Sequence, residues 1–176
     1  GLSEPCPLGT FQPLPAQTFC IDSHPGFFVE NTGSPNQLPC PPGTYSDIER
    51  ASSSEVCIPA ELGFYSPGGV SQPTITDAGF YSSTVGSSSQ TPCPAGSYTG
   101  VIGATSEEDC LETPPGTFSL QGSSIPVLCP SGTYQPDFGQ NTCIDASPGN
   151  FSSDLGQTEQ IVCPSGYFQP ESGRSS

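Results

Sequence analysis

Nine cysteines are the residues of this chain with the most distinctive chemistry. A zinc site needs cysteines or histidines in close pairs such as Cys-x-x-Cys, and the sequence contains no such pair. Cysteines at wider spacings are typical of disulfides, which form in the secretory pathway and outside the cell. We therefore predict a disulfide-bonded protein with an extracellular or cell-surface location. The nine positions are Cys6, Cys20, Cys40, Cys57, Cys93, Cys110, Cys129, Cys143 and Cys163.

The other residues that could do chemistry have no partners at a useful spacing. His24 is the only histidine, so a Ser-His-Asp triad or a histidine metal site is not expected. The 17 acidic residues are scattered, and none has the spacing of an EF-hand. Asp22 and Asp145, each in a Cys-Ile-Asp segment, are interpreted as turn caps, with calcium as a minor alternative, and Glu107 to Asp109 as a solvated patch. We predict that the chain is not an enzyme and has no cofactor.

The composition limits the partners of the chain. The formal net charge is -15, and Arg50 and Arg174 are the only basic residues besides His24. Nucleic-acid binding needs clustered cations, so it is excluded, and docking on anionic lipid is disfavoured. No apolar run of about 18 residues occurs, so no membrane span is expected in this segment.

A glycine followed two residues later by Phe or Tyr recurs ten times. If each repeat begins three residues before its glycine, repeats 1 to 10 begin at residues 6, 23, 40, 60, 76, 93, 113, 129, 146 and 163. Such even spacing is typical of repeat proteins, whose small units stack on their neighbours. We predict a small, disulfide-rich, mostly irregular and β fold. It is an elongated tandem array of about ten 16- to 20-residue hairpin-like units over residues 1–176, without notable helices and with an incomplete last unit.

Two turns are expected in each repeat. A second glycine follows the aromatic residue in most repeats, with Ala16 in its place in repeat 1 and Arg50 in repeat 3. Both glycine positions suit tight turns, and the segment between them, such as 133–136, is predicted to be a short strand with its aromatic facing inward. The alternative role for these aromatics, a sugar-binding ladder, is less favoured than a core role. In residues 46–57 and 106–110 we expect one helical turn at most.

The cysteines follow the same grid. We call the first residue of a repeat its opening position, and the place where the second cysteine falls its closing position. Four repeats have cysteine at both positions and five have it at neither, which predicts a disulfide within each repeat, because a half-pair would leave a free thiol. In the chain-entropy model, a disulfide that closes a loop of about 15 residues stabilises the folded state by roughly 3 kcal/mol. The predicted pairs are Cys6–Cys20, Cys40–Cys57, Cys93–Cys110 and Cys129–Cys143.

The five bridge-free repeats must depend on stacking against their neighbours. Their opening residues are Ser23, Ala60, Thr76, Thr113 and Ala146, and their closing residues are Gln37, Pro73, Gln90, Pro126 and Gln160. Cys163 opens repeat 10 and has no closing partner in the sequence. Three explanations remain open: a truncated chain, which we favour, a bond to another chain, or a free thiol. Because the sequence begins with Gly1 and not with Met, we interpret it as a mature chain or as part of a longer one.

Two further features are candidate sites. The 20-residue repeats 3 and 6 carry insertions, which we place near Ile48-Glu49-Arg50 and near Gly100-Val101-Ile102 and regard as possible binding positions. Asn150-Phe151-Ser152 is an N-glycosylation sequon. A weaker one, Asn141-Thr142-Cys143, ends in a cysteine that should be bridged. The many Ser and Thr residues beside Pro favour O-linked sugar as well.

The openings Cys40-Pro-Pro-Gly-Thr-Tyr and Cys93-Pro-Ala-Gly-Ser-Tyr, with the segment 103–110, resemble the ephrin-receptor-like cysteine-rich repeat. The unit is also similar to the A-type module of tumour necrosis factor receptors. The resemblance covers residues 6–176 and implies an extracellular tandem array with disulfides as rungs and no shared catalytic residue. Family members usually join units through Cys-x-x-Cys. Here Ser, Ala or Thr takes the place of the second cysteine, so about half of the family's disulfides are missing.

These features favour a structural extracellular protein. We expect a repeat segment of a surface stalk, fibre or filament, glycosylated and self-associating or bound to neighbouring repeats of the same protein. The alternative is a ligand-binding receptor or adhesin ectodomain.

Overall fold

The computed structural model describes residues 4–176. The chain divides into two compact units. One comprises the described residues up to Thr76 together with Ser82–Gln90, and the other comprises Asp77–Tyr81 together with Thr91–Ser176. The same repeat pattern is present in both units.

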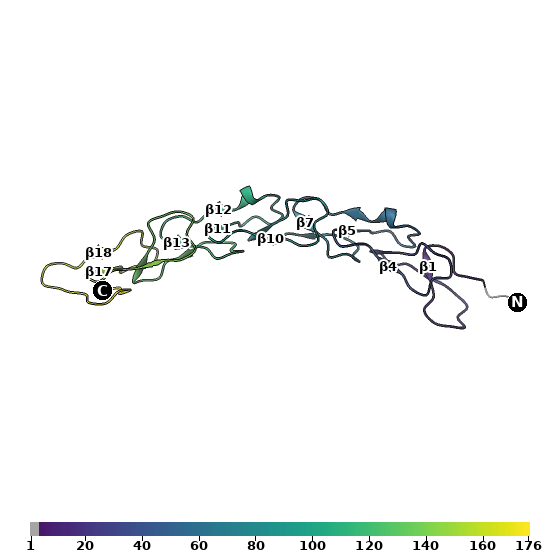
Figure 1. Cartoon of the computed structure of the whole chain (residues 1–176), viewed down its shortest axis with the longest axis horizontal. Helices are drawn as coiled ribbons and strands as arrows, with labels where there is room; N and C mark the ends of the chain where they lie inside the picture. Colours follow the sequence, from purple (N-terminus) through teal and green to yellow (C-terminus); the bar gives the residue numbers. More distant parts are fainter. Residues whose placement is uncertain (1–3) are drawn as a thin grey trace. The chain divides into compact units, whose positions relative to one another are not determined.

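Each of repeats 1 to 9 forms one antiparallel hairpin of two-residue strands, and within a unit the hairpins follow one another along the ribbon (Figure 1). The first strand contains the repeat's aromatic residue, and the second strand directly precedes the next repeat. The first unit contains β1 (Thr10–Phe11) with β2 (Ile21–Asp22), β3 (Phe27–Phe28) with β4 (Leu38–Pro39), β5 (Thr44–Tyr45) with β6 (Ile58–Pro59), and β7 (Phe64–Tyr65) with β8 (Thr74–Ile75). The second unit contains β9 (Phe80–Tyr81) with β10 (Thr91–Pro92), β11 (Ser97–Tyr98) with β12 (Leu111–Glu112), β13 (Thr117–Phe118) with β14 (Val127–Leu128), β15 (Thr133–Tyr134) with β16 (Ile144–Asp145), and β17 (Asn150–Phe151) with β18 (Ile161–Val162).

The only helices among residues 4–176 are two single 3₁₀ turns, η1 (Ser54–Val56) and η2 (Glu107–Asp109). Both lie in the regions where one helical turn at most is predicted. The small disulfide-rich array of hairpins expected from the sequence is therefore confirmed.

A tight turn precedes the first strand in repeats 1 to 9. In repeat 3 the N–H of Thr44 donates to the carbonyl of Pro41 at 3.0 Å, and the Thr44 hydroxyl donates to the same carbonyl at 2.7 Å. Gly43 lies between them with φ 87°, which is a left-handed conformation that side chains disfavour. The proline before the turn lacks an N–H, and the position needs none.

The second turn uses the same backbone region. Ala16 and Arg50, which replace the second glycine, have φ 58° and 53° and are the only non-glycine residues with positive φ in the described chain. The repeat therefore imposes the turn even where the sequence offers no glycine.

The core consists of small side chains and not of the aromatics. Opening residues are almost fully buried in repeats 2 to 9, and Cys6 is 9% exposed. The residue after the aromatic is also buried in repeats 2 to 9, as at Val29, Ser66 and Ser152. Of the ten repeat aromatics, only Phe28 is buried, and Phe168 is 85% exposed. The prediction of inward-facing aromatics is therefore wrong for most repeats, because the backbones approach too closely to leave room for rings between them.

Four backbone hydrogen bonds join each repeat to the next within repeats 1 to 5 and within repeats 6 to 10. Between repeats 1 and 2, the Gly9 N–H donates to the Val29 carbonyl at 2.9 Å, and the Ser23 N–H donates to the Gly9 carbonyl at 2.9 Å. The Gly33 N–H donates to the Cys6 carbonyl at 2.8 Å, and the Gln12 N–H donates to the Ser34 carbonyl at 3.1 Å. The junction of repeats 7 and 8 has the same four bonds, from Gly116 to Gln135, Cys129 to Gly116, Gly139 to Thr113 and Ser119 to Gln140. These bonds involve only backbone atoms, so they tolerate side-chain variation.

A closer contact joins repeats 1 to 3 and repeats 5 to 8 each to the repeat after the next. A Cβ atom built on Gly43 would overlap the carbonyl oxygen of Gly86, two repeats further on. In the second unit, a Cβ on Gly96 would overlap the carbonyl of Gly139 in the same way. The first glycine of a repeat is thus required twice, by its φ and by this approach of two backbones.

Candidate functional site

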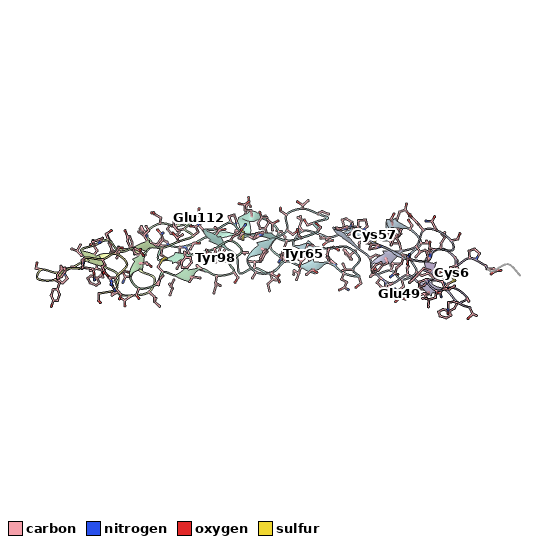
Figure 2. The ribbon with its side chains drawn as sticks, turned by 60° about the horizontal axis from the view of Figure 1, so that its bottom comes forward. Cys6, Glu49, Cys57, Tyr65, Tyr98 and Glu112 are labelled. Carbon is pink, nitrogen blue, oxygen red and sulfur yellow. A yellow bond between two sulfur atoms is a disulfide. The ribbon has the colours of Figure 1, made fainter. Side chains whose placement is uncertain are left out.

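The disulfides that close individual repeats are the most clearly defined sites in the molecule. The structure contains four disulfides, and they join the pairs that the grid predicts: Cys6–Cys20, Cys40–Cys57, Cys93–Cys110 and Cys129–Cys143. Their Cα atoms are 5.6 to 5.8 Å apart, within the ordinary range for disulfides. The opening cysteine is buried in each pair, whereas the closing cysteine lies nearer to the surface. Cys6 and Cys57 are marked in Figure 2.

Two of the bridge-free repeats are closed at the same grid positions by a glutamine. The Oε1 atom of Gln37 accepts a hydrogen bond from the backbone N–H of His24 at 2.8 Å. The Oε1 atom of Gln160 accepts one from the backbone N–H of Ser147 at 2.7 Å. His24 and Ser147 directly follow the opening positions, so the glutamine spans the loop that a disulfide spans elsewhere. This contact is not predicted from the sequence, although glutamine at the closing position of a repeat without cysteines is its signal.

At the opening positions of the bridge-free repeats, small buried side chains take the place of the cysteine. Ser23, Ala60, Thr113 and Ala146 are at most 1% exposed, as are Cys93 and Cys129 at the same position. Only a small side chain fits there, which explains why serine, alanine and threonine replace cysteine. The hydroxyl of Thr113 also donates to the carbonyl of Gly96 at 2.7 Å, so its burial leaves no unpaired donor.

The structure places the insertions of repeats 3 and 6 after the positions expected from the sequence. Arg50 lies in register, because its N–H donates to the carbonyl of Ser23 at 2.9 Å, as Gly33 does to Cys6 one repeat earlier. The additional residues therefore fall between Arg50 and Cys57, where η1 lies, and between Gly103 and Cys110, where η2 lies. The sequence predicts the insertions near Ile48, Glu49 and Arg50, and near Val101 and Ile102. The structure corrects this placement, because the additional residues lie further along each repeat.

The residues at the predicted insertions are nonetheless exposed. Ile48, Val101 and Ile102 are 48%, 53% and 63% exposed, and Glu49, marked in Figure 2, is also exposed. Arg50 lies 3.7 Å from the carboxylate of Asp22 in an exposed ion pair, which contributes little stability. The role of these side chains as binding positions stays a prediction.

η2 brings together one polar pair that the sequence did not predict. The hydroxyl of Tyr81 lies 3.5 Å from a carboxylate oxygen of Glu107, and Tyr81 forms a parallel bridge with Ala104. Partial burial and the neighbouring carboxylate raise the pKa of Tyr81 above 10.0. Asp109 caps the start of η2 by accepting bonds from the N–H groups of Thr105 and Ser106, so it is a structural residue.

The remaining candidates are dispersed. His24 lies on the surface, where its ring meets Phe11 edge-on at 6.3 Å and its Nδ1 lies 3.2 Å from Gln37. Asp22 and Asp145 are exposed residues of strands β2 and β16, which belong to different units. Within residues 4–176, no group of three or more His, Cys, Asp or Glu side chains is arranged to hold a metal ion. Nor does the described part of the chain contain a helix that is long and apolar enough to cross a membrane.

Cys163 and Asn150 occupy regular grid positions. Cys163 has a free thiol, is half-buried, and donates its N–H to the carbonyl of Gly149 at 3.0 Å, as other opening residues do. Asn150 begins β17, and its side-chain amide is exposed, 3.4 Å from the carbonyl of Pro148. The weaker candidate Asn141 precedes Cys143, which is in a disulfide.

Comparison with known proteins agrees with the repeat pattern. Residues 51–110 match the family model described as tyrosine-protein kinase ephrin type A/B receptor-like, which confirms the predicted resemblance for this segment. The chain is also similar to the mouse (Mus musculus) signal peptide, CUB and EGF-like domain-containing protein 2, with 32% identity over 160 residues. That alignment covers 85% of this chain and 16% of the mouse protein, so the chain spans only a small part of its relative.

Proposed function

We propose that this chain is a repeat segment of an extracellular structural protein, such as a surface stalk, fibre or filament, and that it associates with copies of itself or with neighbouring repeats. The observation that carries the proposal is the set of four backbone hydrogen bonds that recurs between successive repeats within each unit. Because these bonds use no particular side chain, further repeats can be added without a new interface. The disulfides and the two comparisons support an extracellular location.

Electron microscopy of the secreted protein tests this function. We expect fibres or filaments in native material, and the same assemblies from purified protein as its concentration rises. A monomeric sedimentation profile at every concentration, together with non-fibrous native material, would refute the self-associating structural role. Because the chain carries a net charge of -15, the assembly should be followed at both low and high salt, since salt screens repulsion between copies.

A second candidate is a ligand-binding receptor or adhesin ectodomain. Exposed apolar side chains outside the repeat core favour it, namely Ile48, Val101 and Ile102. Replacing all three with serine should abolish binding to native cell-surface material if this candidate holds. Leu155, which is 64% exposed in a 17-residue repeat, supplies the matched control for loss of an exposed apolar residue.

N-glycosylation of Asn150 is part of the proposal. The sequon needs the hydroxyl residue at Ser152. In the folded chain Ser152 is fully buried and donates its hydroxyl proton to the carbonyl of Thr133 at 2.8 Å. The sugar is therefore added before β17 and its neighbours fold. A loss of mass on N-glycosidase treatment, absent from Asn150→Gln, would support this, and an unmodified mass in glycosylating cells would exclude it.

A further inference from the structure

Two kinds of loop closure share the same grid. Within the first unit, Cys6–Cys20 and Cys40–Cys57 close repeats 1 and 3 covalently, whereas repeat 2 is closed by the hydrogen bond between Gln37 and the His24 N–H. In the second unit, Cys129–Cys143 closes repeat 8, and repeat 9 is closed by Gln160 and Ser147. Bridged and bridge-free repeats therefore alternate over repeats 1 to 3 and over repeats 6 to 9, whereas repeats 4 and 5 are both bridge-free.

The contacts between successive repeats do not remove this difference. The four backbone hydrogen bonds at the junction of repeats 1 and 2 are the same in kind as those at the junction of repeats 7 and 8. The buried side chains are mostly Ala, Ser, Thr and Cys, so no large apolar core joins distant repeats into one cooperative block. Repeats therefore differ in their resistance to unfolding mainly through their closure, which is either a disulfide or non-covalent.

We propose that the array is a load-bearing element that lengthens in steps, because bridge-free repeats release chain under tension and the disulfide loops set the limit. The inference rests on the proposed structural function. A chain pulled from its ends transmits force through each disulfide, which shortens the path through its loop to about 6 Å between Cα atoms. The loops of the bridge-free repeats have no such shortcut, so they extend once their hydrogen bonds break.

The released lengths follow from the positions of the cysteines. The segment from Cys20 to Cys40 contains repeat 2 and extends to about 7 nm at 3.3–3.6 Å per residue. The segment from Cys143 to Cys163 contains repeat 9 and gives the same length, about 7 nm. A disulfide loop with a sequence separation of 14 withholds about 4 nm, which is its extended length less the distance of about 6 Å between its two Cα atoms.

Single-molecule force spectroscopy on the whole oxidised chain, held at both ends, tests the inference. We expect several separate extension steps and not one rupture. The double variant Ser23→Cys with Gln37→Cys adds a closure to repeat 2, and it should shorten the total extension of the oxidised chain by about 4 nm. In reductant, which opens every disulfide, the variant and the parent chain should extend to the same length. The variant's added disulfide is verified beforehand by intact mass, so an unformed bridge is not mistaken for a negative result.

A second variant tests the glutamine contact itself. Gln37→Ala should lower the force of one step and leave the step's length unchanged, while Gln17→Ala, at an exposed residue of a disulfide loop, should leave all forces unchanged. One all-or-none rupture of the oxidised chain, or unaltered forces in Gln37→Ala, would overturn the inference. Fibres without steps contradict this inference alone, whereas steps in a protein that never forms fibres contradict the self-associating structural function alone.

Discussion

The Oε1 atom of Gln160 accepts a hydrogen bond from the backbone N–H of Ser147, and this contact spans the loop that a disulfide spans in the preceding repeat. The two residues are 13 positions apart, and Gln160 occupies the closing position of repeat 9. Ala146, at the opening position, is fully buried in the place of a cysteine. The repeat thus keeps its geometry without its covalent bond.

Restoring the cysteines of repeat 9 should therefore form a disulfide without rearrangement. The double variant Ala146→Cys with Gln160→Cys places cysteines at the opening and closing positions, where the disulfide of the preceding repeat has a Cα separation of 5.8 Å. Closing a loop of this size should stabilise by about 3 kcal/mol in the chain-entropy model, and the thermal midpoint should rise. Intact mass with and without reductant checks the bond, and Cys163→Ser in the same background removes the competing thiol. A mixture of pairings, or an unchanged midpoint in the bridged form, would contradict the geometric equivalence of the two closures.

The hydroxyl of Ser119 is predicted to be dispensable. Ser119 is fully buried and its Oγ has no hydrogen-bond partner, whereas the Oγ of Ser66, at the equivalent position of another repeat, donates to the Thr44 carbonyl at 2.7 Å. Ser119→Ala removes an unsatisfied polar group, so it should be neutral or stabilise by up to about 1 kcal/mol. Ser66→Ala loses a hydrogen bond and should destabilise by about 1 kcal/mol. Denaturant unfolding of the two variants checks the difference, and equal effects would show that the Ser119 hydroxyl has a partner in solution.

Gly96 should tolerate no side chain. Its φ is 87°, and a Cβ atom would overlap the carbonyl of Gly139 two repeats away. Gly96→Ala should cost at least the 1–2 kcal/mol of a left-handed residue, with a further cost for the displaced backbone. Gly100→Ala is the matched control, since its nearest heavy atom lies 3.7 Å from the added Cβ. Circular dichroism during thermal unfolding measures both, and a Gly96→Ala protein as stable as the control would mean that the contact between alternate repeats is absent in solution.

The repeat grid, the hairpins and the disulfide pairs follow from the sequence, because turns and closures are local and depend on residue types at fixed spacings. Cys129 and Cys143 are an example, since their joint presence and the joint replacement by Ala146 and Gln160 one repeat later reveal the pairing. The small-residue core was not predictable in this way. Phe118 and Tyr134 have the regularity of core residues, but whether a ring fits inside depends on how closely two backbones approach, which is a tertiary property. The contact of Gly96 with Gly139 is non-local for the same reason.

Ionisation of the Tyr81 hydroxyl at high pH should lower the free energy of unfolding of the second unit. Partial burial and the Glu107 carboxylate raise the pKa of this tyrosine in the folded state above the ordinary 10.0. The folded state therefore holds the proton more tightly than the unfolded state, and the contribution to stability is complete below pH 10 and is lost as the pH rises through the folded pKa. Unfolding midpoints measured from pH 8 to 12 should fall less steeply in Tyr81→Phe. Glu107→Gln should bring the ultraviolet titration of Tyr81 closer to that of the other tyrosines, and an unchanged titration would show that the carboxylate does not act on it.

A single cysteine added after Ser176 should close repeat 10. The Gln169 side chain donates its Nε2–H to the Ser176 carbonyl at 2.8 Å. Gln12 donates to the Phe19 carbonyl and Gln135 to the Thr142 carbonyl in the same way, and in both repeats the next residue is the closing cysteine. An added cysteine would thus stand 14 residues from Cys163, the separation of Cys6–Cys20, and should oxidise to an intramolecular disulfide. Thiol titration should fall from one free thiol to none while the protein stays monomeric on non-reducing electrophoresis. Two titratable thiols, or a covalent dimer, would show that repeat 10 does not have the fold of repeats 1 and 8.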